Sequence, residues 1–445
     1  MAQNILPDVL FEIFQRCVPS DMSDVSLTTS PFNLSRVCRS WRHLALERTS
    51  LWATMKLQHD GVRFVHLART KRAWKLWLRR SAAASLTAGI YSDRILDGDD
   101  NDAFAEIVEM TFAEQHRWKD ISIWCNSFTA SPWRTLHLNA SPHLEFLQLR
   151  NQIPLFALPG CSRNEISIDI SEQAHTMHTL SLGGAIYLSP SVGLLPNLHT
   201  IYIQAHCASP RSSALTIQDF FKFILSAPNL TRIYASLIST TSEIDFLPTV
   251  TLPHLRHLQL SIYGFLEHLL GALTCPTLEE LYISFLDEVS KSREIWDAVI
   301  DMLSRSRPPL RYLTLDSSAS HYSGSLRRED QILLILRYTP DLRSMSIRGQ
   351  YLTDKFIDAL NLHSESEVLT GNLCPNLESI TIVCKGEHNI TAEGVKDMIC
   401  SRICDRKGEG TDKHLRKVVL DLKDFEYPPL VEFCSKGGVK LITSK

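Results

Sequence analysis

The sequence has 445 residues, 44% of them hydrophobic and 21% charged, which excludes a disordered chain and is typical of globular proteins. It carries 46 basic and 49 acidic residues, so its net charge of -3 argues against a whole-molecule partner such as nucleic acid. No apolar run approaches the ~20 residues that span a membrane. The 11 cysteines are scattered and the N-terminal residues lack a secretion signal, so we expect free thiols and a cytoplasmic or nuclear location.

Residues 5–17, ILPDVLFEIFQRC, predict a first helix. Pro7 suits the first turn of a helix, where the backbone N–H has no partner, and Asp8 lies where negative charge favours the helix dipole. A turn-rich stretch follows over 19–32. A second helix is predicted from Phe32, with one apolar face recurring at three- and four-residue steps. Its members are Leu34, Val37, Cys38, Trp41, Leu44 and Ala45.

Three blocks of this region, LPDVLFEIF, LSRVCRSWRHLAL and SLW, occur in order over about residues 4–58. They resemble the F-box, in the variant abundant in fungal proteins. The resemblance implies docking onto the Skp adaptor of a cullin–RING ubiquitin ligase. By position, the adaptor-binding residues would be Leu6, Pro7, Ile13 and Phe14 in the first block and Leu34, Val37, Cys38 and Trp41 in the second. Alternatively, these residues form the core of a small helical cap, although a ~50-residue module has little room to bury so many large apolar groups.

A basic amphipathic helix is predicted over 62–80, and a strand over 85–90. Such a helix binds nucleic acid, acidic lipid or an acidic partner in some proteins. We favour the simpler interpretation, in which its apolar stripe packs on the repeats that follow and its basic face is solvated. Residues 59–116 would then form a connector between a helical module over 1–58 and a repeat region over 117–445.

One phrase returns from about residue 118 onward: Pro-x-Leu-x-x-Leu-x-Leu, with other apolar residues replacing some leucines. Its first leucines lie at 144, 198, 230, 255, 278, 310, 342 and 377, at separations typical of leucine-rich repeats and their longer variants. In Leu-x-Leu the two leucines point to one face of a strand and the middle residue to the other. Amphipathic helices are predicted between the phrases, at 217–225, 295–303, 331–338, 356–360 and 395–403.

Strand, turn and helix repeated nine to eleven times predict an α/β fold, in which a small all-α N-terminal module precedes a curved solenoid. This array resembles the leucine-rich region that follows many F-boxes, but the usual Asn after Leu-x-Leu is absent from nearly every copy. A non-repetitive α/β domain is the alternative. The middle residues of the phrase would face a client protein. The client-binding candidates are Gln148, Tyr202, Tyr234, Gln259 and Tyr282.

No catalytic or phosphate-binding signature is found, so we expect neither enzymatic activity nor a cofactor. Cys400-x-x-x-Cys404, with Cys384 and His414, lacks the tight ligand spacing of zinc sites, and packing on a helix face explains it better. The acidic segment 97–102 lacks a calcium-binding Glu and is predicted to be a solvated loop. The leading hypothesis is therefore a substrate-recognition subunit of an SCF-type ubiquitin ligase. There are two other hypotheses: a repeat scaffold without ligase association, and an enzyme with an unrecognised site.

Overall fold

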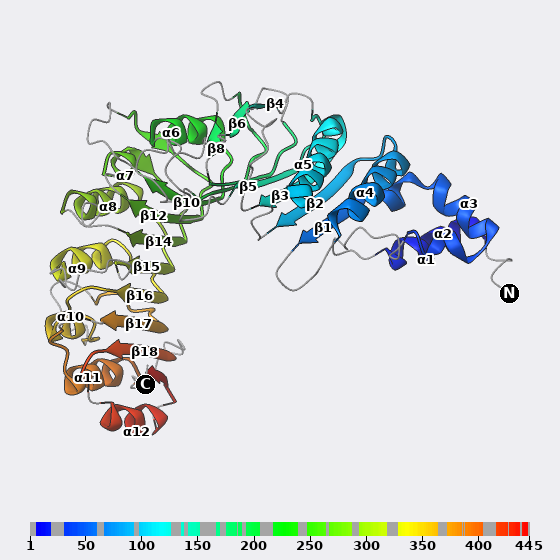
Figure 1. Cartoon of the computed structure of the whole chain (residues 1–445). Coiled ribbons are helices and arrows are strands. Elements are labelled where there is room, and N and C mark those ends of the chain that lie inside the picture. Colours follow the sequence, from blue (N-terminus) through cyan, green and yellow to red (C-terminus); the bar gives the residue numbers. More distant parts are fainter. Residues whose placement is uncertain are drawn as a thin grey trace. The chain divides into compact units, whose positions relative to one another are not determined.

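The computed structural model describes residues 6–18, 31–59, 66–92, 98–125, 135–137, 141–151, 166–169, 175–184, 186–188, 193–204, 217–238, 247–263, 267–286, 293–317, 328–363, 372–384, 386, 388–403, 415–425, 427–436 and 438–443. Within them the fold is mixed α/β, with one long parallel sheet, two small ones and twelve α-helices (Figure 1). The chain divides into an N-terminal unit, Met1–Leu215 with Lys222–Ala227, and a C-terminal unit, Thr216–Phe221 with Pro228–Lys445.

The N-terminal unit begins with an all-helical module and continues with parallel strands. Its helices are α1 (Pro7–Cys17), α2 (Leu34–Val37), α3 (Arg39–Glu47), α4 (Leu67–Ser81) and α5 (Gly98–Ala113), with 3-10 turns at Thr49–Trp52 and Gln115–Arg117. Its main strands, in spatial order, are β1 (Thr54–His59), β2 (Leu86–Ser92), β3 (Trp118–Cys125), β5 (Phe146–Asn151), β7 (Thr179–Gly184) and β9 (Thr200–Gln204). A smaller parallel sheet holds β4 (Thr135–His137), β6 (Ile166–Asp169) and β8 (Ile186–Leu188).

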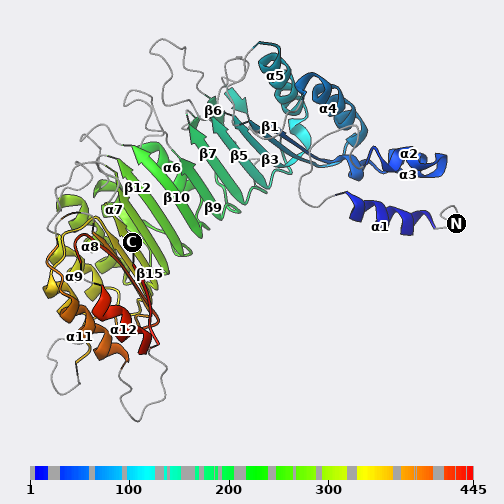
Figure 2. The same cartoon turned by 60° about the horizontal axis from the view of Figure 1, so that its bottom comes forward.

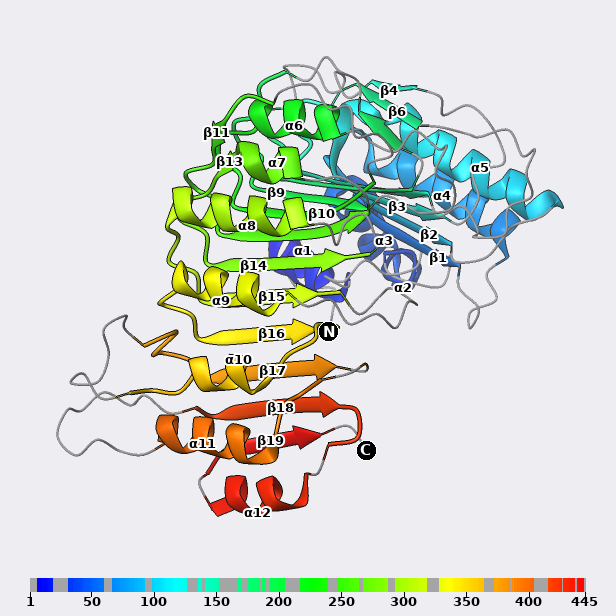
Figure 3. The same cartoon turned by 90° about the vertical axis from the view of Figure 1, so that its left-hand side faces the viewer.

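The C-terminal unit alternates strands and helices along the chain (Figure 3). Its main strands, in spatial order, are β10 (Arg232–Ile238), β12 (His257–Tyr263), β14 (Glu280–Phe285), β15 (Tyr312–Asp316), β16 (Ser344–Arg348), β17 (Ser379–Cys384), β18 (Lys417–Leu422) and β19 (Lys440–Thr443). Two short strands pair separately, β11 (Val250–Thr251) and β13 (Leu273–Thr274). The helices are α7 (Glu267–Ala272), α8 (Arg293–Ser306), α9 (Glu329–Arg337), α10 (Asp354–Ala359), α11 (Ala392–Ile403) and α12 (Pro428–Lys436), and α6 (Ile217–Ser226) is divided between the units.

The repeated phrase explains the register of the strands. Each of its three apolar positions is buried in every strong copy, for example Leu255, Leu258 and Leu260. The first leucine closes a tight turn: Leu255 N donates to Leu252 O at 3.3 Å, and Leu144 N donates to Ser141 O at 3.2 Å. The second and third leucines lie on the helix-covered face of the strands, since successive strand residues alternate between faces. The predicted strand pattern is therefore confirmed within the described residues.

Aromatic side chains join the helical module to the connector helix within the N-terminal unit. The rings of Phe32, Trp52 and Trp77 pack edge to face, with centroid separations of 5.0 to 5.7 Å. Trp52 Nε1 donates to Ala45 O at 2.7 Å, which satisfies its polar atom in the interior. The guanidinium of Arg80 lies 4.4 Å from the Trp52 ring centroid. The apolar face of α4 is therefore buried by packing within the N-terminal unit.

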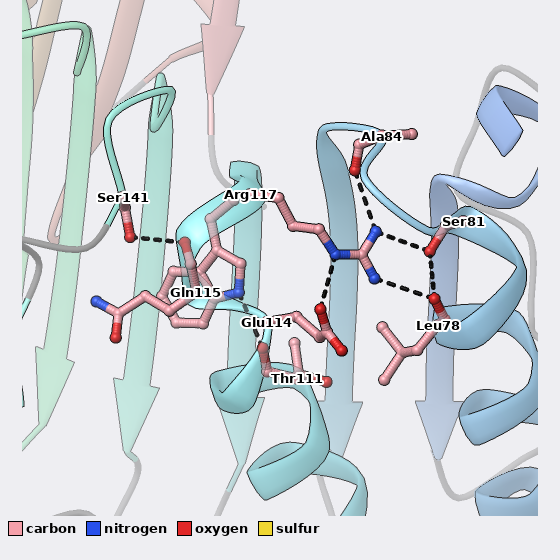
Figure 4. Close-up of polar contacts among 9 residues, drawn as sticks. Leu78, Ser81, Ala84, Thr111, Glu114, Gln115, Arg117 and Ser141 are labelled. Atoms are coloured by element: carbon pink, nitrogen blue, oxygen red, sulfur yellow. Dashed lines mark hydrogen bonds and ion pairs between the residues drawn. The ribbon is translucent and has the colours of Figure 1, made fainter.

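Arg117 ties α4 to the start of β3 (Figure 4). This buried guanidinium donates to Ser81 Oγ at 2.8 Å, to Ala84 O at 3.1 Å and to Leu78 O at 3.1 Å, and its Nε pairs with Glu114 at 2.9 Å. The carbonyls at the end of a helix lack intrahelical partners, so Arg117 satisfies them from a neighbouring element. Arg402 of α11 likewise donates to the carbonyl of Leu360, at the C-cap of α10, and to those of Leu373 and Cys374 in the segment before β17.

Two local predictions are wrong. The helix expected from Phe32 is broken at Cys38, whose backbone is extended (φ -155°, ψ 177°); Arg42 Nε donates to Ser35 O at 2.9 Å and satisfies a carbonyl that the break leaves open. The acidic residues at 98–102 lie in the first turns of α5 instead of in a loop, where negative charge favours the helix dipole. Helices at the other predicted places are confirmed, and none within the described ranges is long and apolar enough to cross a membrane.

Candidate protein-interaction surfaces

Helix α1 exposes one apolar stripe and buries another. Leu6, at its N-cap, is 71% exposed, and Val9 and Ile13 are 50% and 40% exposed. Residues 6, 9 and 13 lie on one face of a helix because they are spaced by three and four positions. On the adjacent face Leu10 and Phe14 are buried. Among the described residues eleven large apolar side chains are exposed, and the segment 6–46 holds five of them, including Val37 at 60% and Leu46 at 41%.

The eight predicted adaptor-binding residues divide into three groups. Leu6, Pro7, Ile13 and Val37 are exposed, Cys38 and Trp41 are half-buried, and Phe14 and Leu34 are buried. Phe14 packs against Trp41 with ring centroids 4.9 Å apart, so these two residues join α1 to α3. The helical module formed by α1, α2 and α3 therefore has an interior of its own and an apolar exterior.

Polar contacts fix the start of α1 against the end of α3. Arg48 pairs with Asp8 at 3.2 Å, and its guanidinium lies 4.8 Å from the Phe11 ring centroid. The ion pair is exposed, so it contributes little to stability. It lies at the first turn of α1, on the helix whose stripe of Leu6, Val9 and Ile13 is exposed.

The client-binding candidates of the C-terminal unit lie side by side. Tyr234 on β10 is in register with Gln259 on β12, and Gln259 with Tyr282 on β14. All three side chains are half-buried and point to the face opposite the buried leucines. The row continues with Thr314, Ser346, Thr381 and Val419 on the following strands. The structure therefore brings residues 185 positions apart in the sequence into one row, as the phrase predicts.

Gln148 and Tyr202 lie in the equivalent row of the N-terminal unit, whose strands are seen side by side in Figure 2. Gln148 is held on both sides, since its Oε1 accepts from Ser122 Oγ at 3.2 Å and its Nε2 lies 3.4 Å from Ser181 Oγ. Ser181 separates Gln148 from Tyr202 in the register. Gln148 is therefore the polar bridge of this row.

Sequence reasoning missed a second row on this face, which holds Tyr91, Trp124, Arg150 and Gly183 in register. These residues lie two positions after the middle of each Leu-x-Leu and so point the same way. The guanidinium carbon of Arg150 is 5.5 Å from the Trp124 ring centroid, and Lys56 Nζ is 5.6 Å from the Tyr91 ring centroid. The alternation of strand residues was the signal that could have found them.

Helix α4 presents cations without an exposed apolar face. Leu67, Trp74 and Trp77 are buried, and Lys71 pairs with Glu106 at 2.8 Å. The cations on its outer side are Arg69, Arg72, Lys75 and Arg79. Because insertion into a lipid surface needs a free apolar face, α4 in this packing lacks the means for that mode of binding.

Seven cysteines of the described part of the chain are free thiols: Cys17, Cys38, Cys275, Cys374, Cys384, Cys400 and Cys434. Burial raises the pKa of the Cys275 thiol to about 12 and that of Cys374 to about 11, so both stay neutral near pH 7 and are poor nucleophiles. The described residues hold no cluster of three potential metal-ligating side chains. Of the weak zinc pattern, Cys384 is buried and Cys400 is half-buried, and Cys404 and His414 lie outside the described residues.

No protein-family model matches this chain, and no curated protein matches it significantly.

Proposed function

We propose that this chain is the substrate-recognition subunit of an SCF-type cullin–RING ubiquitin ligase. The helical module would be an F-box-like domain that docks onto the Skp adaptor. The strand–turn–helix units would be leucine-rich repeats, stacked as a solenoid, that hold a client protein on their helix-free strand face. The protein itself would carry out no covalent chemistry; it would raise the local concentration of the client near the ligase.

The observation that carries the proposal is the exposed apolar stripe of α1. Leu6, Val9 and Ile13 face solvent while Phe14 is fully enclosed. A module that needed these side chains only for its own interior would bury them, since removing one large aliphatic side chain from water stabilises by roughly 1.5–3 kcal/mol. Exposed apolar patches on small modules mark interaction sites. This pattern agrees with the resemblance of the LPDVLFEIF block to the F-box.

The proposed docking surface is narrower than the eight residues of the sequence motif. Leu6, Pro7, Ile13 and Val37 would contact the adaptor, with Cys38 and Trp41 at the margin. Phe14 and Leu34 would support this surface from inside, because both are buried. Val9 joins the surface through its place in the stripe.

A repeat scaffold without ligase association remains the second candidate. The burial of Phe14 and Leu34, and the edge-to-face contact of Phe14 with Trp41, are what a helical cap on the first strands requires. The two candidates differ in whether the exposed stripe has a partner. A direct binding measurement separates them.

The test is titration of the purified chain with purified Skp adaptor by isothermal calorimetry. Val9→Asp places a charge in the stripe and should weaken binding more than ten-fold, because an apolar contact is replaced by a desolvated carboxylate. Val431→Asp is the matched control, since Val431 is also 50% exposed on a helix, and it should bind like the wild type. Circular dichroism of both variants checks that they fold. If the wild-type chain fails to bind the adaptor, the ligase proposal is wrong and the repeat-scaffold hypothesis is favoured.

A further inference from the structure

An arginine, a tryptophan and a glycine from three adjacent strands form one cluster on the helix-free face of the N-terminal unit. Trp124 on β3 is in register with Arg150 on β5, and Arg150 with Gly183 on β7. A methyl group added at Gly183 would lie 3.1 Å from Arg150 Cγ, so the stem of Arg150 rests on the bare backbone of β7. Its guanidinium lies over the Trp124 ring at 5.5 Å.

This cluster contains polar atoms that the described part of the chain leaves unsatisfied. Arg150 Nε and Trp124 Nε1 are both buried and have no hydrogen-bond partner. No carboxylate among the described residues pairs with Arg150. A half-buried guanidinium without an acceptor is costly, and Arg117 shows that this fold supplies acceptors where an arginine is structural. The guanidinium of Arg150 is therefore available to donate hydrogen bonds to an acceptor on another molecule.

The charges around the cluster indicate the kind of partner. The two rows that surround it hold Lys56, Gly89, Ser122, Gln148, Ser181 and Tyr202 in one, and Gln58, Tyr91, Trp124, Arg150, Gly183 and Gln204 in the other. They contain two cations and no carboxylate. The adjoining row on the same face adds one carboxylate, Asp120, which accepts from Thr87 Oγ1 at 3.3 Å, so these three rows together carry an excess of positive charge. Both cations lie beside aromatic rings, which restricts their movement. The surface is complementary to an acidic segment.

The spacing of the two cations sets the length of that segment. Lys56 on β1 and Arg150 on β5 are three strand steps apart and are offset by two residues along the strands, which places their Cα atoms about 16 Å apart at the usual spacings. An extended peptide advances about 3.3 Å per residue, so two acidic residues separated by three others lie about 13 Å apart. The long side chains of lysine and arginine cover the remaining distance when the peptide crosses the strands obliquely.

We propose that the strand face around Trp124, Arg150 and Gly183 binds an extended acidic segment of a partner protein, through a carboxylate or phosphoryl group on Arg150 and a second anion near Lys56. This deepens the proposed function, because it names the chemistry of the client. The small residues Gly89 on β2 and Ser122 on β3, which lie between the cations, leave room for the backbone of the segment. Charge-assisted pairing with a planar guanidinium supplies both affinity and orientation.

The test uses fluorescein-labelled decapeptides of glycine and serine with two glutamates separated by three residues, measured by fluorescence polarisation on the full chain at low salt. Companion peptides carry phosphoserine or glutamine at the same places. The charged peptides should bind more tightly than the glutamine peptide, and the tighter of the two series identifies the anion. Affinity should fall as salt is added, because the contacts are electrostatic.

Three variants show whether Arg150 is responsible. Arg150→Gln should weaken binding at least ten-fold, the usual effect of removing one charged hydrogen-bonding partner. Gly183→Val should also weaken binding, because its side chain would displace the stem of Arg150. Arg348→Gln is the matched control, since Arg348 occupies the equivalent strand position of β16 and donates to Ser346 at 3.3 Å; it should bind like the wild type.

Two results would overturn the inference. One is equal affinity for the charged and glutamine peptides. The other is unchanged affinity in Arg150→Gln when circular dichroism shows the variant folded. Adaptor binding by the same Arg150→Gln protein is measured in parallel and should be unaffected, so a failure of the peptide result is distinguishable from a failure of the ligase proposal.

Discussion

Phe14 of α1 packs edge to face on Trp41 of α3, with ring centroids 4.9 Å apart. Arg48, directly after α3, adds an exposed ion pair with Asp8 and a contact with the Phe11 ring. Because an exposed ion pair contributes little to stability, the aromatic pair contributes more than the ion pair to holding α1 in place. It also explains why the neighbouring stripe of Leu6, Val9 and Ile13 is left outside: one face of α1 is fully used, and the next has no interior to enter.

Replacing Phe14 with Ala should release α1 from the module. The loss of a fully buried aromatic side chain costs about 3–5 kcal/mol of stability. This destabilisation should be confined to α1, because α1 has few other contacts with the rest of the chain. Hydrogen exchange followed by mass spectrometry should show faster exchange in 7–17 and little change in β12 or β14. Ile13→Ala is the control, since Ile13 is exposed on the same helix, and its effect should be within about 0.5–1 kcal/mol. Equal exchange in the two variants would contradict this account of α1.

Arg117→Met should destabilise the junction of α4 and β3 strongly. The substitution removes the guanidinium that donates to the carbonyls of Leu78 and Ala84, and leaves Leu78 O with its hydrogen bond from Ser81 Oγ. Disrupting such a buried charged network costs about 3–5 kcal/mol. Arg305→Met is a graded control: Arg305 donates to the carbonyls of Leu270, Gly271 and Leu273 but is exposed, so about 1 kcal/mol is expected. Urea unfolding curves give both values, and a smaller effect at Arg117 than at Arg305 would refute the role assigned to Arg117.

The stabilising effect of Cys275 should disappear at alkaline pH. Burial raises the pKa of its thiol in the folded chain to about 12, from an ordinary value of 9.0. Below pH 9 the thiol is neutral in the folded and unfolded states alike. Between pH 9 and 12 only the unfolded chain ionises, so the free energy of unfolding falls by up to about 1.4 kcal/mol per pH unit.

Cys275→Ala removes this titration and leaves the other groups unchanged. The difference in free energy of unfolding between wild type and variant, measured with urea at pH 8, 9.5 and 10.5, should therefore shrink as pH rises. A constant difference over this range would show that the thiol is not protected from ionisation in the folded chain.

Local sequence patterns were sufficient for the strands that carry the repeated phrase and for the helices predicted between them, because both depend on short-range periodicity; the helices α5, α7 and α12 were not predicted. The spacing of Leu258 and Leu260 predicts the buried face of β12, and the same spacing repeats in each copy of the phrase. The break at Cys38 escaped prediction because α2 and α3 form one uninterrupted apolar pattern, and the hydrogen bond from Arg42 to Ser35 that accompanies the break is a tertiary detail. The cluster of Trp124 and Arg150 escaped for a similar reason: 26 residues separate them, and only the register of β3 and β5 makes them neighbours.

Adjacent residues of β14 should give opposite phenotypes, which tests the assignment of the two strand faces. Leu281 is fully buried on the helix-covered face, and Leu281→Ala should lower the free energy of unfolding by about 3 kcal/mol. Tyr282 is half-buried on the other face beside Gln259, so Tyr282→Ala should cost only about 1 kcal/mol. The second variant should instead lose client binding, since large tyrosine side chains dominate recognition surfaces.

Client capture in cells, by proximity labelling with the wild type and Tyr282→Ala, provides the functional measurement, and urea unfolding provides the stability. Adaptor binding should be equal in both proteins, because Tyr282 lies in the C-terminal unit and the docking stripe in the N-terminal one. If Tyr282→Ala destabilises the chain as much as Leu281→Ala, the middle residues of the phrase belong to the core and the strand face is not the client surface.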